Sequence, residues 1–176
     1  MRYLAGIAAL ATFAALALGS SPPARSANST DAAFLTMAAQ GGIGELQMAA
    51  VAIRRSRNQV VIDYVRLMRA DHTKNNSQLN AIALKEHRTM PTDPGPAGQT
   101  MIAKLQGLSD ADFNRGYLTS QVTAHTQMLA VMQNEIAKGT DPQLKAFAKM
   151  TLPVVQQHLA LAKKDLAMPS AMPNPM

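Results

Sequence analysis

The sequence contains no cysteine and no tryptophan, and four phenylalanines and three tyrosines supply all of its aromatic rings. Without cysteine, the chain has no disulfide framework, no thiolate metal site and no cysteine nucleophile. Alanine and methionine are plentiful instead; they favour helices, and few positions favour a strand. With 47% hydrophobic residues over 176 positions, the chain can bury one core. The composition therefore predicts a single all-α domain.

The motifs of common enzyme classes are absent as well. The sequence has no GxSxG element, no HExxH pair and no glycine-rich loop that could cradle a phosphate. A ferritin-type di-iron centre needs about four carboxylates and two ExxH pairs in the bundle core, and no ExxH occurs here. These absences disfavour di-iron oxidase and ferroxidase chemistry. Another redox enzyme would require open metal positions and a substrate pocket.

Neither the basic nor the acidic residues are concentrated in one part of the chain. The formal net charge is +6, and the basic residues are scattered, as in the segments AIRRSR and LAKKD. No aromatic residues lie between them to stack on bases, so a solvated surface is expected and nucleic-acid binding is not. A loose peripheral attraction to anionic envelope surfaces is compatible with the excess of basic residues. No segment identifies a protein partner.

The first 26 residues have the pattern of an export signal. A positive start at Met1-Arg2 precedes the apolar run YLAGIAALATFAALALG, and the segment SPPARSA then supplies small residues and prolines. Cleavage is expected after Ser26, with Gly19 as the alternative position, and Ser20 stands where a lipoprotein carries its lipidated cysteine. The apolar run has 17 residues, fewer than the ~20 that a membrane-spanning helix needs. We therefore expect a periplasmic or otherwise exported protein without integral membrane insertion after processing.

Capping residues and apolar periodicity predict four long helices. Their expected ranges are 31–55, 56–88, 109–138 and 142–167. Ser56 and Gln59 form a capping-box pattern at the start of the second helix. Ser109 is expected to cap the third helix, and Asp141 the fourth, with Pro142 in its first position.

The connections between these helices predict how they pack. Short turns join the first helix to the second and the third to the fourth, which makes each pair antiparallel neighbours. The longer connector contains MPTDPGPAGQTM, with a short helix expected over 99–106, and can cross the bundle. We therefore expect a four-helix bundle over residues 31–167 and a disordered tail at 168–176. Pro153 is expected to kink the last helix.

Each expected helix has an apolar stripe at three- and four-residue spacing, and each stripe contains one residue of a type that binds metals. These four residues are Glu45, His72, His125 and His158. Counted from the turns that join the helices, their heights agree to about three residues, or roughly one turn of ~5 Å. We therefore expect the four side chains to converge on one point near the middle of the bundle.

Burying these four groups separately would be costly. A carboxylate loses much of its solvation energy in an apolar interior, and each imidazole must satisfy two ring nitrogens. One divalent cation bound by all four groups would offset both costs. Three imidazoles with one carboxylate suit Zn, Fe(II), Mn or Cu(II). The pattern thus predicts one mononuclear metal site, for metal buffering, delivery or stabilisation of the bundle. The alternative is a metal-free polar cluster in a structural or protein-interaction module of the envelope.

Other residues are weaker candidates for the site. Asp71 neighbours His72 but points about 100° away on a helix, which places it in an outer position or in solvent. Glu135 lies ~15 Å beyond His125 along the helix, and His87 lies off its stripe at a helix end. Thioethers near the ligands would favour Cu(I), although methionine is a common core filler. The nearby methionines are Met48, Met68, Met128 and Met132.

Four segments of the sequence resemble one known family. They are FLTMAAQGGIGELQMAAVA, VIDYVRLMRADHTKNNSQLNAIA, DFNRGYLTSQVTAHTQML and LPVVQQHLALAKKD. Together they carry a Glu in the first helix, an Asp-His pair in the second, and one His in each of the third and fourth. This combination resembles the exported bacterial family of domain of unknown function (DUF) 4142, over about residues 31–165. The resemblance implies a ferritin-like four-helix bundle in the cell envelope, and it carries over no activity.

Overall fold

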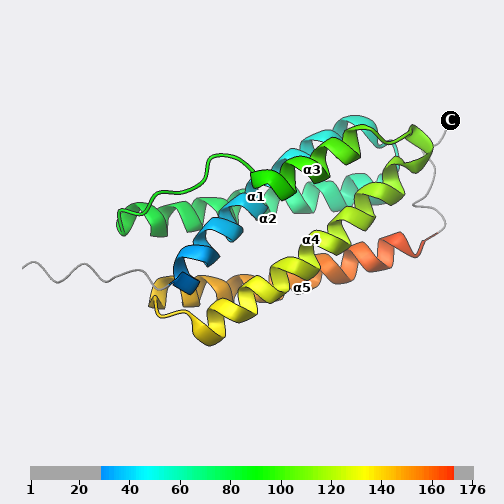
Figure 1. The fold of residues 1–176 in the computed structure, drawn as a ribbon. Helices are drawn as coiled ribbons and strands as arrows, with labels where there is room; N and C mark the ends of the chain where they lie inside the picture. Colours follow the sequence, from blue (N-terminus) through cyan, green and yellow to red (C-terminus); the bar gives the residue numbers. More distant parts are fainter. Residues whose placement is uncertain (1–28, 169–176) are drawn as a thin grey trace, which may run out of the picture.

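The computed structural model describes residues 29–168, and within this range all regular structure is helical (Figure 1). The five helices are α1 (Ser29–Arg55), α2 (Gln59–Lys85), α3 (Gly95–Gln106), α4 (Asp110–Lys138) and α5 (Pro142–Leu166). The four long helices form the bundle, and α3 lies on its outside (Figure 1). The prediction of an all-α four-helix bundle is confirmed, with a fifth helix added to it.

Contacts at both ends of the bundle make α1 and α4 antiparallel neighbours. At one end, Asp31 near the start of α1 accepts a hydrogen bond from the backbone N–H of Thr140, just after α4, at 2.8 Å. At the other end, the guanidinium of Arg55 in α1 forms an ion pair with the carboxylate of Asp110 in α4 at 2.7 Å. The start of each helix therefore lies beside the end of the other.

The connection from α2 to α4 runs along the length of the bundle. α2 and α5 are also antiparallel, because Arg88, just after α2, forms an ion pair with Asp141, just before α5. Both α2 and α4 pack against α1 and α5, so they lie on a diagonal and run in the same direction. The chain must therefore return from the end of α2 to the start of α4, and α3 is part of this return. The predicted long crossover is confirmed, and the topology is ferritin-like.

α3 is longer than the short helix predicted over 99–106. It begins at Gly95, whose φ of +66° turns the chain into the helix. This positive φ favours glycine, and a Cβ atom here would lie 2.7 Å from the end of the Gln40 side chain in α1, which would have to move. The proline-rich sequence suggested a connector, but proline is tolerated in the first turn of a helix. α3 packs against α1 and α4.

The caps predicted at Ser109 and Asp141 are confirmed, because each side chain accepts hydrogen bonds from the first turn of its helix. The capping box predicted at Ser56 is wrong. The N–H of Ser56 donates to the carbonyl of Ala52 at 2.9 Å, so this residue still belongs to the end of α1. Asn58 caps α2 instead, since its side-chain oxygen accepts from the backbone two residues later.

α2 ends at Lys85, before the predicted end at Arg88. His87 adopts a φ of +54°, in the left-handed region. The N–H of Arg88 donates to the carbonyl of Ala83 at 2.8 Å, which closes the last turn. This motif usually has glycine or asparagine in the left-handed position. A histidine there does not signal a helix end in the sequence, so the boundary was misplaced.

The buried apolar side chains form two clusters, one toward each end of the bundle. From α2, α4 and α5, the first includes Met68, Leu118 and Ala162, and the second includes Leu79, Met132 and Val155. Positions 72, 125 and 158 lie between these members in the sequence of their helices. The hydrophobic core is therefore interrupted at one level, near mid-length.

No helix among residues 29–168 is long and apolar enough to cross a membrane. The export signal predicted at 1–26 lies outside the described residues, as does the predicted tail beyond Met168. α5 continues through Pro153 as one helix.

Replacing Asp31 with alanine should destabilise the bundle. The buried carboxylate accepts hydrogen bonds from the N–H and hydroxyl of Thr140 and from the N–H of Asp141. Because these groups would lose their partner, urea-induced unfolding should show a free energy of unfolding lower by about 1–3 kcal/mol. Asp63→Ala removes an exposed carboxylate and should change it by less than about 0.5 kcal/mol. Equal stability of the two variants would contradict this account of the bundle end.

Candidate metal centre

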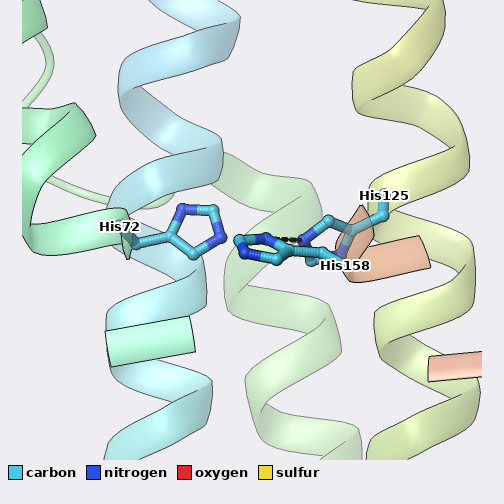
Figure 2. Close-up of side chains that lie close together, drawn as sticks. All are labelled: His72, His125 and His158. Atoms are coloured by element: carbon cyan, nitrogen blue, oxygen red, sulfur yellow. Dashed lines mark hydrogen bonds between the residues drawn. The ribbon is translucent and has the colours of Figure 1, made fainter. Parts of the chain in front are cut away.

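Three of the four predicted site residues meet where the hydrophobic core is interrupted. His72 comes from α2, His125 from α4 and His158 from α5. One ring nitrogen of each lies within 4.8 Å of the other two, and the three rings face one another across the bundle (Figure 2). No other group of this kind occurs among residues 29–168.

The hydrogen bond that His125 makes on its outer side fixes its tautomer. Nδ1 lies 3.0 Å from the backbone carbonyl oxygen of Gln121, one turn earlier in α4. Because a carbonyl oxygen can only accept, the proton of the neutral ring is on Nδ1. Nε2 then carries a lone pair, and it points toward His158 (Figure 2).

The outer partner of His158 fixes the opposite tautomer. Nε2 lies 2.9 Å from Oδ2 of Asp71, a carboxylate that accepts this N–H. The lone pair of His158 is therefore on Nδ1, which lies 3.2 Å from Nε2 of His125. Two nitrogen lone pairs thus face each other with no proton between them. Two nitrogens bound to one tetrahedral zinc at 2.0–2.1 Å would lie about 3.3 Å apart, so this separation suits a shared cation.

His72 is the third ring of the group, and one of its nitrogens has no hydrogen-bond partner. Its Nε2 is buried and makes no hydrogen bond. The ring centroid lies 5.7 Å from that of His125 and 5.5 Å from that of His158. A buried nitrogen without a partner is costly, and a metal ion held with the other two rings would remove that cost.

Glu45 lies close to the three rings but on a different side of His125. Its Oε2 accepts a hydrogen bond from the side-chain amide of Gln121 at 2.8 Å. Its Oε1 is 3.8 Å from Nδ1 of His125, the nitrogen that does not face His158. The carboxyl group is buried and lies behind the ligand set, on the side of the His125 ring that faces away from His158. Direct ligation by Glu45 stays a prediction.

Sequence reasoning missed two of the residues that hold the site in place. Gln121 bonds both His125 and Glu45, and it lies one helical turn before His125. The hydroxyl of Tyr64 in turn lies 3.3 Å from the side-chain oxygen of Gln121 and from the carbonyl of His158. The four-residue spacing from His125 could have identified Gln121. No local pattern relates Tyr64 to residues on α4 and α5.

Burial shifts the pKa values of the predicted site residues. Burial and the neighbouring rings of His125 and His158 lower the pKa of His72 to about 3. Burial lowers the pKa of His125 to about 4, and it lowers that of His158 against the opposing effect of Asp71. Burial also raises the pKa of Glu45 to about 7. The imidazoles are therefore neutral near neutral pH, the protonation state that binds metals.

A cavity of about 360 Å³ opens beside the histidines, between α1, α3 and α4. His72, His125 and Glu45 line it together with methionine, glycine, alanine, glutamine, proline and valine residues. Two of the three rings are therefore reachable from this cavity. His158 does not line it.

The remaining sequence candidates lie outside the histidine group. Glu135 is buried near the end of α4, beside Asp31, where burial and that carboxylate raise its pKa to about 7. His87 lies after the end of α2. Asp71 takes the outer position that its place on the helix suggested.

The metal-free protein should lose stability in acid, and His72 should contribute to the loss. The unfolded chain protonates this ring near pH ~6.5, whereas the pKa of the folded ring is about 3. Between these values the unfolded state binds more protons, so a falling pH lowers the free energy of unfolding by up to about 1.4 kcal/mol per pH unit. Urea unfolding between about pH 6 and 4.5 should give a shallower pH slope for His72→Leu. Equal slopes in the two proteins would show that the folded ring is not held neutral.

Comparison with known proteins gives a related fold and a family. No curated protein matches the sequence. The crystal structure of a DUF305 fragment from Deinococcus radiodurans matches with a TM-score of 0.71 and 15% identity, covering 80% of this chain and 97% of that chain. At this identity the likeness concerns the helical fold alone. The family described as Domain of unknown function (DUF4142) matches residues 17–164, a range that includes all three histidines. The chain therefore belongs to the DUF4142 family.

Proposed function

We propose that this chain reversibly binds one divalent transition metal ion through His72, His125 and His158. Its role is to buffer or deliver that metal in the cell envelope. Three neutral imidazoles suit Zn(II), Fe(II) or Cu(II).

The contact between His125 and His158 carries the proposal. Their facing nitrogens are 3.2 Å apart, and the outer partners of both rings place lone pairs on these atoms. A hydrogen-bonded histidine pair without metal would have a proton on one of the two nitrogens. A metal ion accepts both lone pairs at once, and the outer hydrogen bonds then act as the orienting contacts that metal-bound histidines usually have.

The cavity beside the rings supports reversible binding rather than a purely structural ion. Structural zinc sites are closed by four protein ligands, whereas sites that exchange ligands keep an open position. Here the protein supplies three clustered ligand atoms, and two of the rings line an open cavity. An ion bound at this point can be reached from outside without unfolding the bundle.

Metal should stabilise the wild-type protein, and removal of one ligand should abolish the effect. A ligand at a hundredfold excess over its dissociation constant stabilises the folded state by about 2.7 kcal/mol. Thermal unfolding with Zn(II), Cu(II) or Fe(II), against a chelator-treated sample, should therefore show a metal-dependent rise in melting temperature. His125→Ala should lose this rise.

The matched control is His87→Asn, because this histidine lies outside the site and asparagine tolerates its left-handed backbone. It should keep the full metal-dependent rise. If the two variants respond alike, or if the wild type shows no rise with any of the three metals, the histidines form a metal-free polar cluster. The protein would then be a structural or interaction module.

Export is the second part of the proposal, and it rests on the pattern of residues 1–26. Intact mass spectrometry of protein from the envelope fraction should give a chain that begins at Ala27, or at Ser20 if cleavage follows Gly19. Recovery of the full-length chain embedded in the membrane would contradict it.

A further inference from the structure

The cavity beside the histidines has an unusual lining. Four methionines border it from three different helices: Met37 and Met48 from α1, Met101 from α3, and Met128 from α4. No lysine, arginine, phenylalanine or tyrosine contributes to the lining. The lining thus combines thioethers with two imidazoles, two glutamine amides and the buried carboxyl group of Glu45.

The four methionines differ in their exposure to solvent. Met37 is 42% exposed, whereas Met48 is only 3% exposed. Met101 and Met128 are half-buried between these extremes. The cavity therefore offers thioethers both at the protein surface and in its interior.

The backbone of α1 leaves room for these side chains. A Cβ atom on Gly41 would lie 2.5 Å from the terminal methyl of Met128, so a larger residue would displace that side chain. The thioether end of Met128 therefore reaches across from α4 to the surface of α1. Gly44 lines the same cavity and faces only Pro94.

The chemistry of the lining selects a class of ligand. A thioether is a soft and uncharged donor, so it binds Cu(I) and Ag(I) far better than Zn(II) or Mn(II). An anion would find no cationic side chain in the cavity, and Glu45 would repel it if ionised. If these methionines served only to fill the hydrophobic core, they would pack closely and leave no cavity of about 360 Å³ between them.

We propose that this methionine-lined cavity, formed by Met37, Met48, Met101 and Met128, binds a soft monovalent cation such as Cu(I) next to His72 and His125. The cavity is a second binding region that shares His72 and His125 with the histidine site, so this step rests on the proposed function. The cation stays monovalent while it is bound in the cavity, so no electron transfer is involved.

Silver(I) is the probe, since it is soft, monovalent and redox-inert. The full chain is labelled with ¹³C at the methionine methyl groups and titrated with Ag(I). The signals of the four cavity methionines should shift and saturate near one equivalent. Met68, buried in the core, and Met150, exposed on α5, provide internal controls and should not shift. Equal shifts at the controls and the cavity methionines would overturn the proposal.

A double variant tests the same point by affinity. Met37→Leu with Met128→Leu keeps the side-chain volume but removes two thioethers. It should weaken Ag(I) binding about tenfold or more and leave Zn(II) affinity unchanged. Met150→Leu should change neither. Unchanged Ag(I) affinity in the double variant would also overturn the proposal.

The imidazole signals separate this inference from the proposed function. Zn(II) should shift the ring signals of the three histidines and leave the cavity methionines in place. If Zn(II) shifts the rings but Ag(I) does not shift the methionines, the histidine site stands and the soft-cation cavity is refuted. If none of Zn(II), Cu(II) and Fe(II) changes the ring signals, the proposed function itself fails.

Discussion

The site depends on one contact, the 3.2 Å separation between Nε2 of His125 and Nδ1 of His158. The carbonyl of Gln121 holds the proton of the first ring on its far side, and Asp71 does the same for the second. Each outer bond would be ordinary alone. Together they direct two lone pairs at each other in a buried layer. In the function that we propose, a cation between the rings would accept both lone pairs at once.

The bundle topology is what brings these rings together. Because neighbouring helices are antiparallel, a residue near the middle of one helix lies beside the middle of the next, whichever way the chain runs. Apolar clusters on both sides of the layer fix its height. The crossover then adds α3 against α1 and α4, where it borders a cavity that reaches two of the rings. Burial thus holds the imidazoles neutral, while the cavity keeps them accessible.

Periodicity predicted the bundle and most of the site, because a buried stripe leaves a clear pattern. The three histidines stood out as polar residues on apolar stripes, and counting residues placed them at one height. The position of Glu45 behind His125 could not be predicted, since it depends on side-chain direction and on the amide of Gln121. Two helix boundaries were misplaced because a capping asparagine and a left-handed histidine decided them. Those are single-residue conformations, which the apolar pattern does not record.

Long-range ¹H–¹⁵N NMR of the imidazole rings tests the central claim most directly. In metal-free protein near neutral pH, His125 should be the Nδ1–H tautomer and His158 the Nε2–H tautomer. On addition of Zn(II), the ¹⁵N signals of the facing nitrogens, Nε2 of His125 and Nδ1 of His158, should change to those of metal-bound nitrogen, with the outer N–H groups retained. A proton on either facing nitrogen that persists after one equivalent of Zn(II) would contradict the account.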